Sequence, residues 1–166
     1  MDVRFDAAGK AAYEAAVSTA RMKYLAIGDE MAAAAALRQF DSPEIGGIRM
    51  AQNPYETVNG TYALVGIRDG WPYFQSVTGS HFIYHRTLSK GPEWALNMYY
   101  DPAADSANGR IPCDGGRLPL GVQQWMGSRQ ARAPQTVILL ELSLVSPGEV
   151  IAAREVVQAE REMAQG

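Results

Sequence analysis

Cysteine and histidine are scarce in this chain, which has one cysteine, Cys113, and two histidines among 166 residues. A single cysteine excludes an internal disulfide and any metal site built from several cysteines. The scarcity also suits a reducing compartment, so an intracellular location is favoured. We therefore expect no metal and no cofactor.

Excess positive charge and long apolar runs are lacking as well. The net charge is −3, from 15 lysines and arginines against 18 aspartates and glutamates, and this argues against a nucleic-acid partner. The longest apolar run, TVILLELSLV, is interrupted by Glu141 and is too short to span a bilayer. The opening MDVRFDAAGKAAYEAAV has no apolar core typical of a signal peptide. We expect a soluble or peripheral protein without a transmembrane segment.

The first 55 residues predict a helical extension. An Ala-rich helix begins after Asp6, whose carboxylate can cap the first turn. One face of that helix carries Tyr13, Val17, Ala20 and Tyr24. Gly28 is predicted to end the helix, and Asp29 to cap a second one, EMAAAAALRQF. Residues 41–54 are rich in Pro and Gly and read as a connecting loop.

Residues 56–145 change to the alternating pattern of an antiparallel sheet. The dipeptide Asp69-Gly70 is a strong signal for a tight hairpin between two strands. The predicted strands cover residues 61–68, 71–77, 81–86, 93–100, 123–126 and 136–144. We expect an open meander of about five to six strands.

The last segment, residues 146–166, predicts one amphipathic helix. Ser146 and Glu149 have the spacing of a capping box, with Pro147 at the first helical position. Its apolar stripe, which we expect to lie against the sheet, consists of Ala152, Val156, Ala159 and Met163. The whole chain is then a single α+β domain: a meander flanked by two N-terminal helices and one C-terminal helix.

Aromatic side chains concentrate between residues 59 and 100, on both faces of the predicted meander. One reading makes these rings the packed core. The other makes some of them an exposed surface that stacks on a ligand or a peptide. If they bind, the candidate residues are Trp71, Tyr73, Tyr84 and Trp94, together with Arg117 from a loop that also holds Arg110, Arg129 and Arg132.

The same stretch resembles a small β module that recurs in predicted proteins of single-celled algae. The likeness rests on the segments NGTY, DGWPYF, GSHFIYH and WALN, and on the closing LPLGVQQWMGSRQARAPQTVILLE. It covers residues 56–140, about half of the chain. The resemblance implies a compact β module and no particular activity.

The same segment also resembles, more faintly, the WW domain, in which a tyrosine and the second tryptophan bind proline-rich peptides. Those roles would fall on Tyr84 and Trp94. The sequence departs from that family because Pro102 lies eight residues beyond Trp94 and because Pro72 directly follows Trp71. The likeness therefore implies a mode of aromatic recognition more than a fold.

Few residues have the pattern of a catalytic or metal site. His81 and His85 are four apart, which on a strand separates them by about 13 Å, too far to share an ion. The oxygen ligands in Asp101–Gly109 lack the spacing of a calcium loop. Cys113 could act as a thiolate nucleophile if nearby arginines lowered its pKa and His85 served as base. No other enzyme constellation is apparent.

Three functions remain open at this point. The first is a non-enzymatic interaction or scaffold module that binds a protein partner through the aromatic sheet face or the Arg-bearing loop. The second is a small accessory subunit of a larger complex, organellar or membrane-associated, that docks through its Ala-rich helices. The third is an enzyme that uses Cys113 or His85.

Overall fold

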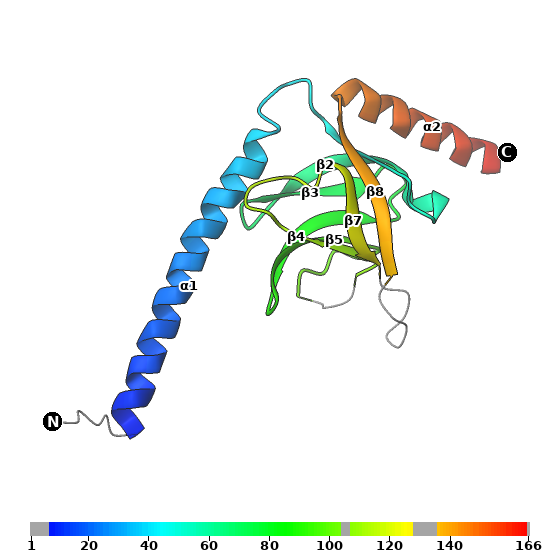
Figure 1. Ribbon diagram of the computed structural model, residues 1–166. Coiled ribbons are helices and arrows are strands. Elements are labelled where there is room, and N and C mark those ends of the chain that lie inside the picture. Colours follow the sequence, from blue (N-terminus) through cyan, green and yellow to red (C-terminus); the bar gives the residue numbers. More distant parts are fainter. Residues whose placement is uncertain (1–6, 104–106, 128–135, 166) are drawn as a thin grey trace.

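The computed structural model describes residues 7–103, 107–127 and 136–165. Eight antiparallel strands form a closed barrel in chain order, and the first strand pairs with the last (Figure 1). The strands are β1 (Gly47–Ala51), β2 (Gly60–Arg68), β3 (Trp71–Ser76), β4 (Phe82–Leu88), β5 (Gly91–Asn97), β6 (Gly109–Pro112), β7 (Gly121–Gly127) and β8 (Thr136–Val145). A short 3-10 helix, η1 (Glu56–Val58), joins β1 to β2. The prediction of an open meander with five to six strands is therefore wrong.

Two strands that the sequence pattern missed account for the difference. β1 lies in the stretch read as a connecting loop, and it closes the barrel by pairing Ile48 with both Tyr62 of β2 and Leu144 of β8. β6 is only four residues long and follows a Pro- and Gly-rich segment. A strand this short is too brief for alternation to reveal it.

The hairpin between β2 and β3 confirms the turn expected at Asp69-Gly70. Arg68 pairs with Trp71 across a two-residue loop, and Asp69 and Gly70 have φ angles of 52° and 84°. Positive φ at both positions matches the turn type that suits the twist of a hairpin. This turn, together with the β4–β5 turn and the β6–β7 loop, lies at one end of the barrel, because connections alternate between the ends of an up-and-down barrel.

Large side chains fill the barrel. An eight-stranded barrel is just wide enough to be packed by its own inward-facing side chains. Its fully buried residues include Trp94, Trp125, Tyr62, Phe74, Ile48, Met50, Ile83, Leu96, Leu140 and Leu142. The rings that dominate residues 59 to 100 are thus mainly core.

One long helix, α1 (Ala7–Arg38), replaces the two N-terminal helices that we predicted. Gly28 does not end it, since a mid-helix glycine costs only about 1 kcal/mol relative to alanine. The predicted cap at Asp29 therefore falls inside the helix, whereas the cap at Asp6 lies outside the described residues.

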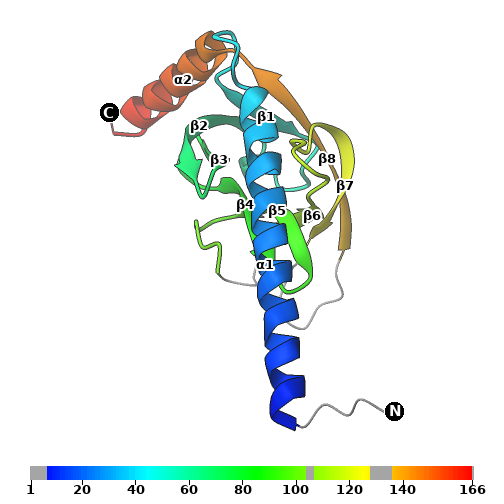
Figure 2. The same cartoon turned by 90° about the vertical axis from the view of Figure 1, so that its left-hand side faces the viewer.

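The second part of α1 packs on one end of the barrel. Ala33 lies next to the turn at Gly70, where a Cβ would come 3.3 Å from the alanine methyl. A Cβ at Gly116 would overlap Ala35, and the Gln39 amide donates to the Gly116 carbonyl at 2.9 Å. The small residues of this segment allow close approach, so the helix closes this end of the barrel. The first part of α1 projects beyond the barrel (Figure 2).

The C-terminal helix, α2 (Pro147–Gln165), begins as predicted. The Ser146 amide donates to the Glu149 carboxylate at 3.2 Å, and the Glu149 amide donates to the Ser146 hydroxyl at 3.1 Å, a reciprocal capping box. The face that contacts the barrel is not the predicted one. Val150 is buried against Ala63 and Val145, whereas the predicted stripe of Ala152, Val156, Ala159 and Met163 is exposed. The cap and Val150 fix the rotation of the helix about its axis, and this turns the stripe outward.

Candidate functional site

The predicted aromatic site is not an open surface. Trp71 and Trp94 pack in the main core with 3% and 1% of their surface exposed. Tyr84 is fully buried in a second cluster, and Tyr73 is half-buried beside it. Three of the four rings proposed for ligand binding are therefore covered by the protein itself.

His85 is sandwiched among these rings inside the barrel. Its ring stacks on Trp71 with centroids 3.5 Å apart and meets Trp94 edge-on at 5.6 Å. Desolvation by burial lowers the pKa of His85 to about 4. Its Nε2 has no hydrogen-bond partner within the described residues. A neutral, stacked imidazole of this kind serves packing and cannot be protonated readily near neutral pH.

Tyr84 belongs to an aromatic cluster outside the barrel. Tyr100 packs on Tyr73 and Tyr84, with ring centroids 4.9 and 5.0 Å apart, and covers them. The guanidinium of Arg68 lies 5.1 Å from the Tyr100 ring, within the range of a cation–π contact. The loop after β5 thus folds back and seals this part of the wall.

A buried ion pair lies on the neighbouring wall. Arg86 donates to the Glu93 carboxylate through Nη2 at 3.0 Å and Nε at 3.2 Å, and its side chain is inaccessible to solvent. Arg110 approaches the same carboxylate oxygen at 3.9 Å. Breaking a buried ion pair lowers the stability of the fold because it leaves an uncompensated charge in the interior. This group therefore holds β4, β5 and β6 in place relative to one another.

The Arg-bearing loop is only partly described. Arg117 is exposed, with Asp114 3.9 Å away as a solvent-screened partner. Arg110 faces Glu93, whereas Arg129 and Arg132 lie outside the described residues. The two arginines that can be placed do not converge on one surface.

Cys113 does not have the environment of a catalytic nucleophile. Burial raises the pKa of its thiol to about 11, the direction opposite to that of an activated thiolate. The thiol donates to the Gly115 carbonyl at 3.0 Å. His85, the base proposed for it, has its own pKa lowered far below neutrality. Among the described residues no cluster of three His, Cys, Asp or Glu side chains could hold a metal ion, and Asp105 of the suspected oxygen-rich loop is outside them.

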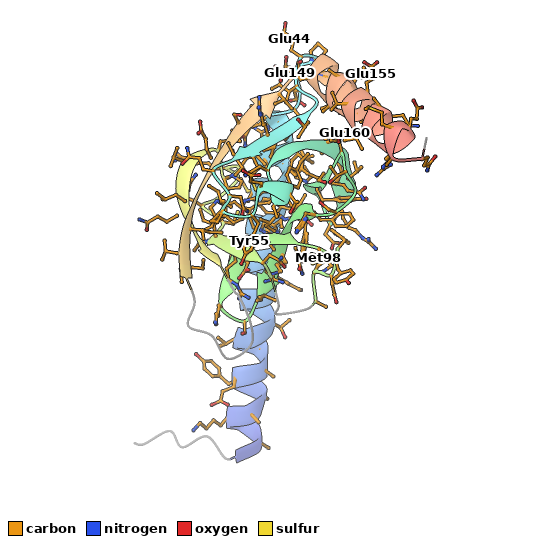
Figure 3. The ribbon with its side chains drawn as sticks, turned by 90° about the vertical axis from the view of Figure 1, so that its right-hand side faces the viewer. Glu44, Tyr55, Met98, Glu149, Glu155 and Glu160 are labelled. Carbon is orange, nitrogen blue, oxygen red and sulfur yellow. The ribbon has the colours of Figure 1, made fainter. Side chains whose placement is uncertain are left out.

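The most distinctive exposed surface runs along α1. None of the side chains described between residues 8 and 31 is buried. Large apolar residues nevertheless occur there: Val17, Ile27 and Met31 have 36%, 58% and 69% of their surface exposed, and Tyr13 has 64%. Figure 3 shows this part of the helix extending below the barrel with its side chains in the open.

These residues follow the spacing of a coiled-coil seam. Apolar residues recur in steps of four, three, four, three and four at Tyr13, Val17, Ala20, Tyr24, Ile27 and Met31, which we call the α1 seam. Alternating steps of four and three define the heptad pattern by which two helices pack together. The face of α1 that contacts the barrel, at Ala32, Ala33 and Ala36, is a different one.

Sequence reasoning found the first four seam residues and missed Ile27 and Met31. The reason was the assumption that Gly28 ends the helix, which cut the pattern short. The regular spacing across Gly28 was a usable signal, because six apolar residues in heptad register rarely continue through a helix end.

No protein-family model matches this chain, and neither a curated protein nor a solved structure matches it. The likeness to the algal module thus stays a prediction. Neither helix, in the residues described, has the length and apolarity needed to cross a lipid bilayer.

Proposed function

We propose that this protein is a non-enzymatic interaction module that pairs with a second copy of itself through the α1 seam. The observation that carries the proposal is a heptad seam whose described side chains are all exposed, on a helix that projects from a well-packed barrel. In this view the barrel is the scaffold and α1 is the interaction arm.

The projecting part of α1 gives a physical reason for a partner. Helical segments without tertiary contacts are only marginally stable in water, even when rich in alanine. Exposed apolar side chains aligned in one stripe add a favourable gain on burial, about 25 cal/mol per Å² of apolar surface removed from water. Pairing two seams therefore stabilises both helices at once.

Opposed helix dipoles favour an antiparallel arrangement of the two helices, because each positive N-terminal end then lies beside the negative C-terminal end of the other helix. The charged residues along this part of α1 are mixed in sign and do not set the orientation: Lys10, Glu14, Arg21, Lys23, Asp29 and Glu30.

The test is sedimentation velocity of the full chain over a concentration series, compared with Ile27→Glu. We expect the wild type to approach twice the chain's mass as concentration rises and Ile27→Glu to stay monomeric. A matched control is Ile67→Glu on β2, because Ile67 is 62% exposed against 58% for Ile27 and lies on the barrel. The control should dimerise like the wild type. A wild type that is monomeric throughout, or a loss of dimer with Ile67→Glu alone, would overturn the proposal.

A further inference from the structure

A surface groove lies between α2 and the barrel, away from the α1 seam. The groove has a volume of about 210 Å³ and is lined by Val65, Gln75, Ser76, Val77, Gly79, Arg154 and Arg161. It involves neither α1 nor the barrel interior. We propose that this groove binds a phosphate group, as inorganic phosphate or as a phosphomonoester.

Two arginines supply the charge. Arg154 and Arg161 are seven residues apart on α2, two turns or roughly 10 Å along the axis, and so lie on the same face. Val150 and Val157 lie on that face as well, about one turn before Arg154 and Arg161 respectively. Long arginine side chains from such positions can converge on one group between them.

No carboxylate neutralises this pair within the described chain. Arg161 donates to the backbone carbonyl of Thr78 at 3.1 Å, which fixes its direction without cancelling its charge. Arg154 makes no hydrogen bond or ion pair among the described residues. Three glutamates adjoin the arginines in sequence but lie about 100° around the helix from their neighbours: Glu155, Glu160 and Glu162.

The opposite wall includes Gln75 and Ser76, and the Ser76 hydroxyl belongs to a hydrogen-bonded chain that extends beyond the groove. Ser76, Thr78 and Ser80 form a hydrogen-bonded chain, with oxygen separations of 2.5 Å for Ser76–Thr78 and 3.0 Å for Thr78–Ser80. The chain continues to His81, whose Nδ1 lies 2.9 Å from the Ser80 hydroxyl. Among these hydroxyl residues only Ser76 lines the groove, so the hydroxyl donor available to an oxyanion there is that of Ser76.

Phosphate suits this donor set better than a carboxylate or chloride does. A phosphate group has several oxygens and up to two negative charges, and paired arginines recognise it through charge-assisted hydrogen bonds. A carboxylate has only two oxygens and would use fewer of the donors of two guanidinium groups. Chloride would gain little from the directional donors.

The full chain is titrated with inorganic phosphate and, separately, with O-phosphoserine, and the heat of binding is measured by isothermal titration calorimetry. A titration with sodium chloride at the same ionic strength is the control. We expect saturable binding that Arg154→Gln weakens at least about tenfold, the loss expected for a hydrogen bond between charged groups. Arg154 has no bond within the described fold, so its substitution should leave folding intact, as circular dichroism will verify. Arg49→Gln, on the exposed side of β1, is the matched control and should bind like the wild type.

Binding of O-phosphoserine but not phosphate, or the reverse, would identify which form of the group the groove accepts and would support the proposal. Binding that chloride abolishes at equal ionic strength, binding that Arg154→Gln leaves unchanged, or no saturable binding at all would overturn it. None of these outcomes bears on pairing through α1, because the groove and the α1 seam share no residue.

Discussion

The barrel and the projecting part of α1 differ in the solvent exposure of their apolar side chains. Inside the barrel, Trp94 and Trp125 are almost inaccessible. On α1, Ile27 and Met31 are more than half exposed although they belong to an equally regular apolar pattern. The barrel completes its own core, whereas the described seam side chains of α1 remain exposed.

This difference teaches where to look for function in a chain of this kind. The most conspicuous feature of the sequence, its cluster of aromatic rings, is occupied by packing. An exposed apolar stripe lies instead on α1, an alanine-rich helix that looks unremarkable by composition.

Removing a ring from the barrel should have the largest effect. Trp125→Ala deletes a fully buried side chain and should lower the free energy of unfolding by about 3–5 kcal/mol, measured by urea denaturation. Ile27→Ala, measured at a concentration where the chain is monomeric, should lower it far less. Equal losses for the two substitutions would mean that the seam is already buried within one chain.

The buried ion pair should come next. Glu93→Gln leaves the Arg86 guanidinium buried without its carboxylate and should cost about 3 kcal/mol of unfolding free energy in the same assay. The matched control is Asp114→Asn, which removes the exposed pair with Arg117 and should change nothing measurable. Tolerance of Glu93→Gln would show that Arg86 does not depend on this partner.

His85 should make stability depend on pH. Its pKa is about 4 in the folded protein, below the ordinary 6.5. The unfolded chain therefore binds the proton first as the pH falls, so the free energy of unfolding decreases from about pH 6.5 down to about pH 4, by a few kcal/mol at most. His85→Phe keeps a stacked ring and should flatten this slope. Burial also lowers the pKa of His81, so His81→Gln should flatten the slope as well. An unchanged slope in His85→Phe would contradict the burial of a neutral imidazole.

The smallest effect is expected at the start of α2. Ser146→Ala removes the hydroxyl that accepts the Glu149 amide and should cost about 1 kcal/mol, seen as a lower melting temperature. Ser143→Ala on the exposed side of β8 is the control and should have no effect. If Ser143→Ala lowered the melting temperature as much as Ser146→Ala, the effect of Ser146→Ala could not be assigned to the capping box.

Local signals in the sequence predicted local structure well. The Asp69-Gly70 hairpin and the Ser146–Glu149 capping box depend on residues a few positions apart, and both are as expected. Six of the eight strands were predicted close to their observed bounds. These features follow from backbone preferences that any short segment carries with it.

Closure of the barrel could not be predicted in the same way. It depends on β1 pairing with β8, a contact between opposite ends of the sheet sequence that no local pattern specifies. The orientation of α2 was missed for a related reason, since Val150 and its contacts with Ala63 and Val145 decide which face turns inward. The burial of Trp71, Tyr84 and Trp94 could not be predicted from residue type, because the folded barrel determines which rings are covered.

The most direct test of pairing through α1 is the distance between spin labels, measured by double electron–electron resonance in the background of Cys113→Ser. Labels are placed in turn at Thr19→Cys, near the middle of the α1 seam, and at Ala8→Cys, near its start; both residues are exposed. An antiparallel pair predicts a separation under about 25 Å for residue 19 and over about 30 Å for residue 8, given a rise of 1.5 Å per residue. Short distances at both positions would contradict the antiparallel arrangement, and no coupling at either would contradict pairing through α1 altogether.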